Sequence, residues 1–203
     1  MKRIAIYILL IFFSKECLAK YARIYLPSML EHSEVIVYGK IISIDSLTIR
    51  IVSLDKVKGN NIKDTVEILK FMNWTCAHRY SKYEAGQEAI FFLVLNEQNK
   101  FKVMGSGNEG ELTVSSNTAY YPDYGQKKFK SKIFTFFSSY EKCISMNVPT
   151  CIDGIKLYFK NLESIEKQLN IEKGRAVYTD NSIAPLPKNM FLEIIMDQKR
   201  TMS

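Results

Sequence analysis

Apolar and polar residues alternate in short runs between residues 34 and 114, a pattern typical of β-strands separated by turns. The first two runs, 35–44 and 47–54, are rich in β-branched residues. Asp45 and Ser46 interrupt them, so we expect the two runs to form a hairpin.

Further strands are predicted downstream. A third strand is expected around 66–68, and a loop over 72–86 follows it. The apolar segment 89–95 is too short for a typical helix and predicts a buried central strand. Residues 101–103 predict its hairpin partner, and 111–114 can add one more short strand. Short strands joined by tight turns favour a small closed barrel or a sandwich.

The hydrophobic period changes after residue 125. A first helix is predicted from apolar residues at helical spacing: Phe129, Ile133, Phe136, Phe137 and Tyr140. A second helix is predicted with Asp153 as its N-cap and an apolar stripe running from Tyr158 to Leu169. A last apolar segment, 190–196, fits either a helix or an extended strand.

The first 19 residues have the order of a secretory signal peptide. Lys2 and Arg3 precede an apolar run over 4–13, and a small-residue cleavage site ends at Ala19. The run is shorter than the ~20 apolar residues that cross a membrane, and no later segment is long enough either. We therefore expect an exported protein, periplasmic or extracellular, that begins at Lys20 and has no transmembrane segment.

These features divide the chain into three parts. Residues 1–19 are the predicted signal peptide, 20–125 a β-barrel domain, and 126–203 a helical C-terminal region packed on or beside the barrel. The signal holds three cations and one acid, so its removal lowers the net charge from +7 to +5. A modestly basic balance of this kind concerns solubility and association rather than a particular site.

Three cysteines remain after the predicted cleavage: Cys76, Cys143 and Cys151. In an oxidising compartment two of them are expected to join, which leaves one thiol over. We favour Cys143 with Cys151, because Asn147 and Pro149 between them suit a reversing loop. The rival pairing joins Cys76 to the C-terminal region.

Three segments carry a resemblance to a known module. They are Ser33–Ile41 (SEVIVYGKI), Lys56–Gly59 (KVKG) and Tyr83–Leu93 (YEAGQEAIFFL). In their order they resemble the netrin-type module shared by the tissue inhibitors of metalloproteinases (TIMPs) and many exported bacterial proteins. The resemblance covers somewhat under half of the chain. It implies a five-stranded OB-like barrel flanked by helices, a mainly β fold with C-terminal helices (α+β).

One departure from that family bears on mechanism. The metalloproteinase inhibitors begin with a cysteine whose amine and carbonyl chelate the zinc of the protease. Here the expected first residue is Lys20, and Cys17 lies inside the predicted signal. Protease inhibition by that route is therefore not implied.

Candidate chemistry is sparse. The chain has two histidines and lacks the His-Glu-x-x-His, Gly-x-Ser-x-Gly and Cys-x-x-Cys motifs, so we expect no catalytic residues, no metal and no cofactor. Cys76 and His78 form at most half a metal site. The glycine-rich segment Gly105–Gly110 has dinucleotide-binding spacing, but a predicted strand follows it where a helix is required.

The most distinctive loop runs from Trp74 to Tyr80. Trp74, Arg79 and Tyr80 combine aromatic surfaces with a cation and are the candidate binding residues, able to stack on a sugar or grip a carboxylate. We favour the alternative in which Trp74 plugs one end of the barrel and Arg79 is solvated.

The leading functional hypothesis is an exported, non-catalytic module that binds a protein or another envelope component. The alternative is a secreted protease inhibitor that acts through the barrel loops, and the third is an enzyme of an unrecognised type. Single-stranded nucleic acid is not expected as a partner, because the predicted strands are apolar or mixed rather than rich in Arg and Lys.

Overall fold

The computed structural model describes residues 24–59, 61–73, 79, 81–105, 109–122, 132–136, 139–172 and 186–202, with the backbone alone for 132–136, 139–142 and 171. These residues include nine strands: β1 (Val35–Ile44), β2 (Thr48–Lys58), β3 (Thr65–Leu69), β4 (Glu88–Leu95), β5 (Phe101–Val103), β6 (Glu111–Ser115), β7 (Thr118–Pro122), β8 (Lys132–Phe136) and β9 (Ser139–Asn147). The described helices are α2 (Leu26–His32), α3 (Val148–Lys160), α4 (Leu162–Glu172) and α5 (Met190–Met202).

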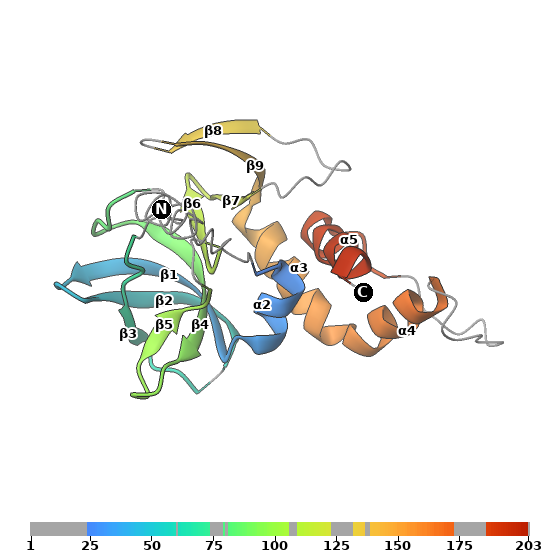
Figure 1. Ribbon diagram of the computed structural model, residues 1–203, viewed down its shortest axis with the longest axis horizontal. Coiled ribbons are helices and arrows are strands. Elements are labelled where there is room, and N and C mark those ends of the chain that lie inside the picture. The colour runs from blue at the N-terminus through green and yellow to red at the C-terminus, as the bar shows by residue number, and fades with distance from the viewer. Residues whose placement is uncertain are drawn as a thin grey trace, which may run out of the picture.

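The first five strands close into a barrel (Figure 1). Their order is β1-β2-β3-β5-β4, and β4 pairs back onto β1. Neighbours are antiparallel except β3 and β5, which are parallel where Ile68 lies opposite Phe101. The chain is therefore mainly β with C-terminal helices, and its core is a five-stranded OB-like barrel, as predicted.

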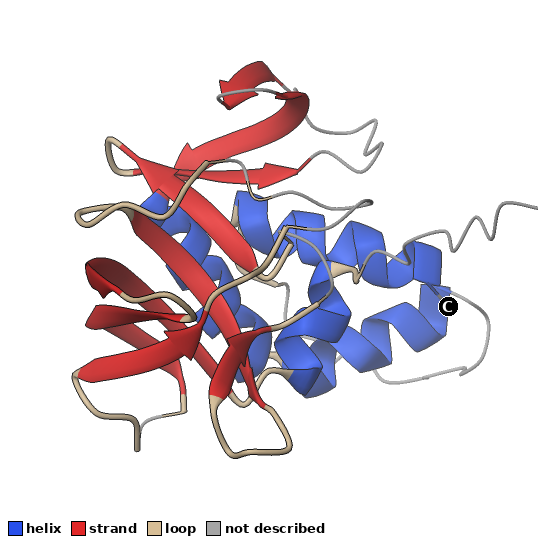
Figure 2. Cartoon of the chain, turned by 60° about the vertical axis from the view of Figure 1, so that its left-hand side comes forward, coloured by secondary structure: helices blue, strands red, loops and turns tan. Residues whose placement is uncertain are grey.

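Strand β4 is buried on both faces, which explains its continuous apolar sequence. Phe91 and Leu93 point into the barrel and belong to the cluster that fills it. Ile90 and Phe92 point outward and belong to a second, larger cluster under the helices. Figure 2 shows the resulting arrangement, with the strands gathered on one side and the helices on the other.

In the KVKG segment, Lys58 joins the barrel to α2, and Gly59 forms the turn after β2. The Lys58 ammonium donates hydrogen bonds to the carbonyls of Leu30 (2.8 Å) and Glu31 (3.2 Å) at the end of α2. Gly59 has a φ of 84°, and a Cβ there would lie 2.9 Å from Val35 Cγ2. Glycine is required at this turn both for its backbone angle and for its small size.

The sheet continues beyond the barrel through β6, which was predicted as a short strand at 111–114, and through three strands that the sequence patterns did not predict. β6 pairs with β4, and β7, β9 and β8 follow in that order. The prediction of a helix over 129–140 was wrong, because 132–136 and 139–147 form the strands β8 and β9. Aromatic and β-branched residues are frequent in this segment, and they favour extended structure where the second edge of β7, which pairs with β6 on its first edge, offers hydrogen bonds.

The second predicted helix exists, but it begins earlier than expected. Its N-cap is Asn147, whose side-chain oxygen accepts a hydrogen bond from Thr150 N (2.7 Å), and Pro149 lies in its first turn. Asp153 is therefore inside α3 rather than at its cap. The stripe from Tyr158 to Leu169 is divided by Asn161 between α3 and α4. The undecided segment at 190–196 is helical and opens α5.

Cys143 on β9 and Cys151 in the first turns of α3 are buried, and the structure does not join them by a disulfide. The residues between them are a strand end and a helix start rather than a reversing loop. Asn147 and Pro149 therefore do not form a reversing loop, and the Cys143–Cys151 pairing stays a prediction. Cys76 and the predicted signal, 1–19, lie outside the described residues.

Within the described part of the chain, none of the helices has the length and apolar character needed to cross a membrane.

Candidate functional site

A buried ion pair lies where the long β3–β4 loop, residues 70–87, meets the start of β6. Arg79 comes from the loop and Glu111 from the first position of β6, and their side chains are 2% and 1% exposed. The Arg79 Nε lies 3.1 Å from each Glu111 carboxylate oxygen, and Nη2 donates to Oε1. Such fork-like contacts are the strong form of a carboxylate–guanidinium pair.

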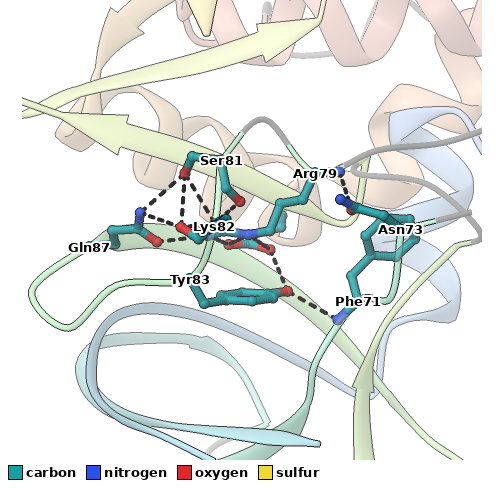
Figure 3. Close-up of polar contacts among 8 residues, drawn as sticks. Phe71, Asn73, Arg79, Ser81, Lys82, Tyr83 and Gln87 are labelled. Atoms are coloured by element: carbon teal, nitrogen blue, oxygen red, sulfur yellow. Dashed lines mark hydrogen bonds and ion pairs between the residues drawn. The ribbon is translucent and has the colours of Figure 1, made fainter. Parts of the chain in front are cut away.

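The remaining Arg79 donors hold the loop itself (Figure 3). Nη1 donates to the carbonyls of Ser81 (2.8 Å) and Lys82 (3.2 Å), and Nη2 also donates to Gln87 Oε1 (3.1 Å). A guanidinium has five N–H donors, so these contacts and Glu111 together account for its hydrogen-bonding capacity. The Arg79 side chain is thus committed to the protein interior.

Tyr83 completes the cluster from below the guanidinium plane. The Arg79 Cζ lies 3.7 Å from the centroid of the Tyr83 ring, a cation–π distance. The Tyr83 hydroxyl donates to Glu111 Oε2 and accepts from Phe71 N, both at 3.1 Å. Burial raises the pKa of the Tyr83 hydroxyl far above its ordinary value, and the adjacent Glu111 carboxylate adds to the rise. Tyr83 therefore acts as a neutral donor.

The cluster closes one end of the barrel. Glu111 is the register partner of Phe91, whose side chain points into the barrel, so Glu111 faces the same interior. Tyr83 packs against the interior cluster. Hydrogen bonds surround the buried Arg79–Glu111 pair. They offset the desolvation free energy that burying two charges requires.

The loop residues predicted for binding separate into two groups. Arg79 is described, and it is neither solvated nor directed at an external ligand, so the prediction that it is solvated was wrong. Trp74 and Tyr80 lie outside the described residues, as do Cys76 and His78, and a binding role for Trp74 and Tyr80 stays a prediction. Arg79 N donates to Asn73 Oδ1 (2.8 Å), so the described chain is fastened on both sides of residues 74–78.

Sequence reasoning missed Glu111, Gln87 and the role of Tyr83. No clear signal for Glu111 existed in the sequence, because in the predicted strand 111–114 it shares a face with Thr113, opposite the apolar Leu112 and Val114. Tyr83 and Gln87 belong to the YEAGQEAIFFL segment. In this protein, that part of the resemblance reflects the packing of the loop against the barrel.

Exposed apolar residues lie at the same end of the barrel. Ile42, Ile44 and Leu47 at the β1–β2 turn are 47%, 38% and 63% exposed, and Met72 in the loop is 63% exposed. Lys70 N donates to Leu47 O (2.9 Å), which brings the start of the loop beside the turn. The site thus combines a fastened loop with an accessible apolar surface.

No family model matches the chain. No curated protein matches it either. Among solved structures, one match is a crystal structure described as that of an exosome complex RNA-binding protein, with 14% sequence identity over 89% of this chain and 99% of that chain. Its TM-score is 0.27, and at that value the likeness carries no argument about fold or function.

Proposed function

We propose that this protein is an exported, non-catalytic binding module, netrin-like in its barrel, that engages a protein or another component of the cell envelope or exterior. The sequence supports export through the predicted signal peptide. The structure supports binding rather than catalysis through what the Arg79 cluster does. The charged groups of this cluster, Arg79 and Glu111, are engaged in the hydrogen bonds that hold the loop in place.

The observation that carries the proposal is the fastening of the β3–β4 loop. Arg79 forms a hydrogen bond with Asn73 within the loop, and its ion pair with Glu111 attaches it to β6 beside the barrel. A loop that is held at Asn73 and Arg79 before binding loses less conformational freedom on binding, which favours affinity. Binding surfaces commonly lie on loops supported by a rigid scaffold.

The exposed apolar residues beside the loop supply the rest of the surface. Apolar side chains that are accessible and adjacent to polar ones are a common feature of recognition sites. We assign Leu47 and Met72 to this surface together with Trp74 and Tyr80, the two sequence-predicted binding residues.

The proposal is tested by binding of the purified mature chain to envelope and culture-supernatant fractions of its host. We expect saturable binding that Leu47→Asp weakens by about tenfold or more, as for a residue central to an interface. Leu54→Asp is the matched control, because Leu54 is also exposed (48%) but lies seven residues further along the chain, within β2. Absence of saturable binding, or robust hydrolytic or transfer activity in the pure protein, contradicts the proposal.

The second candidate is a secreted protease inhibitor that acts through the barrel loops. The same fastening of the loop favours it, because inhibitors that insert a loop into a protease bind in a largely preformed conformation. Stoichiometric inhibition of any member of a broad protease panel, lost in Trp74→Ala, supports this candidate. Failure to inhibit the whole panel contradicts it.

A further inference from the structure

The two ends of the described chain meet in the helical layer. The backbone N–H of Leu26 in α2 donates to Gln198 Oε1 in α5 (2.9 Å), and Gln198 Nε2 donates to the Tyr121 hydroxyl on β7 (2.6 Å). Gln198 and Tyr121 are 3% and 1% exposed. One buried side chain near the C-terminus thus joins the first described helix to the extended sheet.

A second contact repeats this connection closer to the surface. Lys199 in α5 donates to Glu31 in α2 (2.8 Å) and to the hydroxyl of Tyr158 in α3 (3.2 Å). Tyr158 in turn donates to Glu31 (2.9 Å). Three helices from different parts of the sequence therefore share one polar cluster.

Helix α5 also fills the centre of the layer. Phe191, Ile194 and Ile195 are fully buried, and the Phe191 ring meets Tyr121 edge to face with centroids 6.0 Å apart. At Gly154 in α3 an added Cβ would lie 2.8 Å from Phe191 Cβ, so the two helices approach more closely than a larger residue allows. Removal of α5 would leave the apolar faces of α2 and α3 without this cover.

The two hydrophobic clusters become complete at different points along the chain. The buried members of the barrel cluster lie between Val35 and Val103. The buried members of the layer cluster run from Leu26 to Met196 and include five residues of α5: Phe191, Leu192, Ile194, Ile195 and Met196. The seven-residue helix α2 is too short to be stable alone in water.

We propose that α5 is a C-terminal clasp. The barrel can form from the first half of the chain, and docking of α5 is the step that closes the helical layer and orders α2 and α3. The use that we propose for the clasp, unlike the clasp itself, rests on the proposed export. Because the second core needs α5, it cannot be complete until residues 190–202 have been synthesised, long after the signal peptide, so the precursor stays incompletely folded while the signal peptide directs it out.

Hydrogen exchange on the purified full chain tests the clasp. Ile195→Ala should make the amides of α2 and α3 exchange about tenfold faster or more, while those of β2 and β3 keep the wild-type rate. Ile195→Val should act in the same direction to a smaller extent, and it carries the test if the alanine variant does not fold. The matched control is Met202→Ala, since Met202 is in the same helix and 45% exposed.

Two results overturn the clasp. One is wild-type exchange of α2 and α3 in both Ile195 variants. The other is equal acceleration of α2, α3, β2 and β3, which would mean that the two cores open together.

The use of the clasp in export is tested separately by pulse labelling of the full precursor. Ile195→Ala should be processed at least as fast as wild type, and slower processing contradicts the role in export. If the wild-type precursor is never processed, the export proposal fails, whereas the exchange experiment still decides whether α5 is a clasp.

Discussion

At the scale of single residues, Arg79 shows how much a partner distant in the sequence can change the role of a side chain. Its neighbours in the loop are polar and aromatic, and they indicated a solvated cation or a binding residue. The ion pair with Glu111, 32 residues further along the chain, instead holds the Arg79 side chain in the protein interior. No local pattern links the two, because the predicted strand 111–114 has its apolar residues, Leu112 and Val114, on the face opposite Glu111.

The ion pair should be essential for stability. Glu111→Gln keeps the size of the side chain and leaves the buried guanidinium without its counter-charge, so we expect the free energy of unfolding to fall by about 3 kcal/mol. Urea denaturation measures this change. Glu67→Gln on the exposed face of β3 is the control, expected within about 0.5 kcal/mol of wild type. A loss at Glu111 no larger than at Glu67 would show that the pair does not hold the barrel end.

The fastening of the loop can be followed with its tryptophan. Trp74 is the only tryptophan in the chain, so intrinsic fluorescence reports on this loop alone. Arg79→Lys retains the charge but not the five planar donors, and we expect the acrylamide quenching constant of Trp74 to rise. Lys82→Arg, an exposed change in the same loop, should leave quenching unaltered. Equal quenching in all three proteins would contradict the fastening.

The cluster of Glu31, Tyr158 and Lys199 predicts a pH dependence. Burial alone would raise the pKa of Glu31, but hydrogen bonds from Lys199 and Tyr158 outweigh it and hold that pKa below its ordinary value of 4.5. The stabilisation is therefore complete above pH 4.5 and is lost as the pH falls through the lowered pKa. We expect the difference in thermal midpoint between wild type and Glu31→Gln to be largest near neutrality and to shrink in acid. A difference that is constant from pH 7 to pH 3 would refute this.

At the scale of elements, the strands of the barrel and β6 were predictable, and the strands after β6 were not. The runs at 35–44 and 89–95 correspond closely to β1 and β4, because burial on one or both faces leaves a clear pattern. The residues of β8 and β9 also fit a helical spacing. Only the pairing of β9 with β7 decides between the two states, and that pairing cannot be seen in a local window.

The start of α3 gives a quantitative test at this scale. Asn147→Ala removes the side-chain oxygen that caps the helix, which should cost about 1 kcal/mol, or roughly 2–4 °C in the thermal midpoint for a chain of this size. Asn147→Asp should restore most of the loss, because aspartate is an equally good cap. Asp153→Ala, at the residue predicted from sequence to be the cap, should have a smaller effect than Asn147→Ala, and the reverse order would contradict the assigned cap.

At the scale of the whole molecule, the sequence predicted an OB-like barrel followed by helices, and this architecture is correct. It did not predict that the chain would have two cores with β4 between them. Helices α2 and α5, which lie far apart in the sequence, meet through Gln198 and Lys199. Neither residue stands out in a periodic pattern, because each acts through a partner more than 70 positions away.

The redox state of the cysteines depends on the compartment in which the whole molecule folds. Burial raises the pKa of the Cys151 thiol, which makes it a poor nucleophile in the folded state. A Cys143–Cys151 bridge would therefore have to form before α3 packs, during folding in an oxidising compartment.

Export is the claim on which the proposed function depends most. The measurement that tests it most directly is intact and peptide mass spectrometry, without reduction, of the protein recovered from its native host. We predict a mature chain that begins at Lys20, with a mass deficit of one disulfide at Cys143 and Cys151. A chain that retains residues 1–19 and carries only free thiols would contradict export and, with it, the account of this protein as an exported binding module.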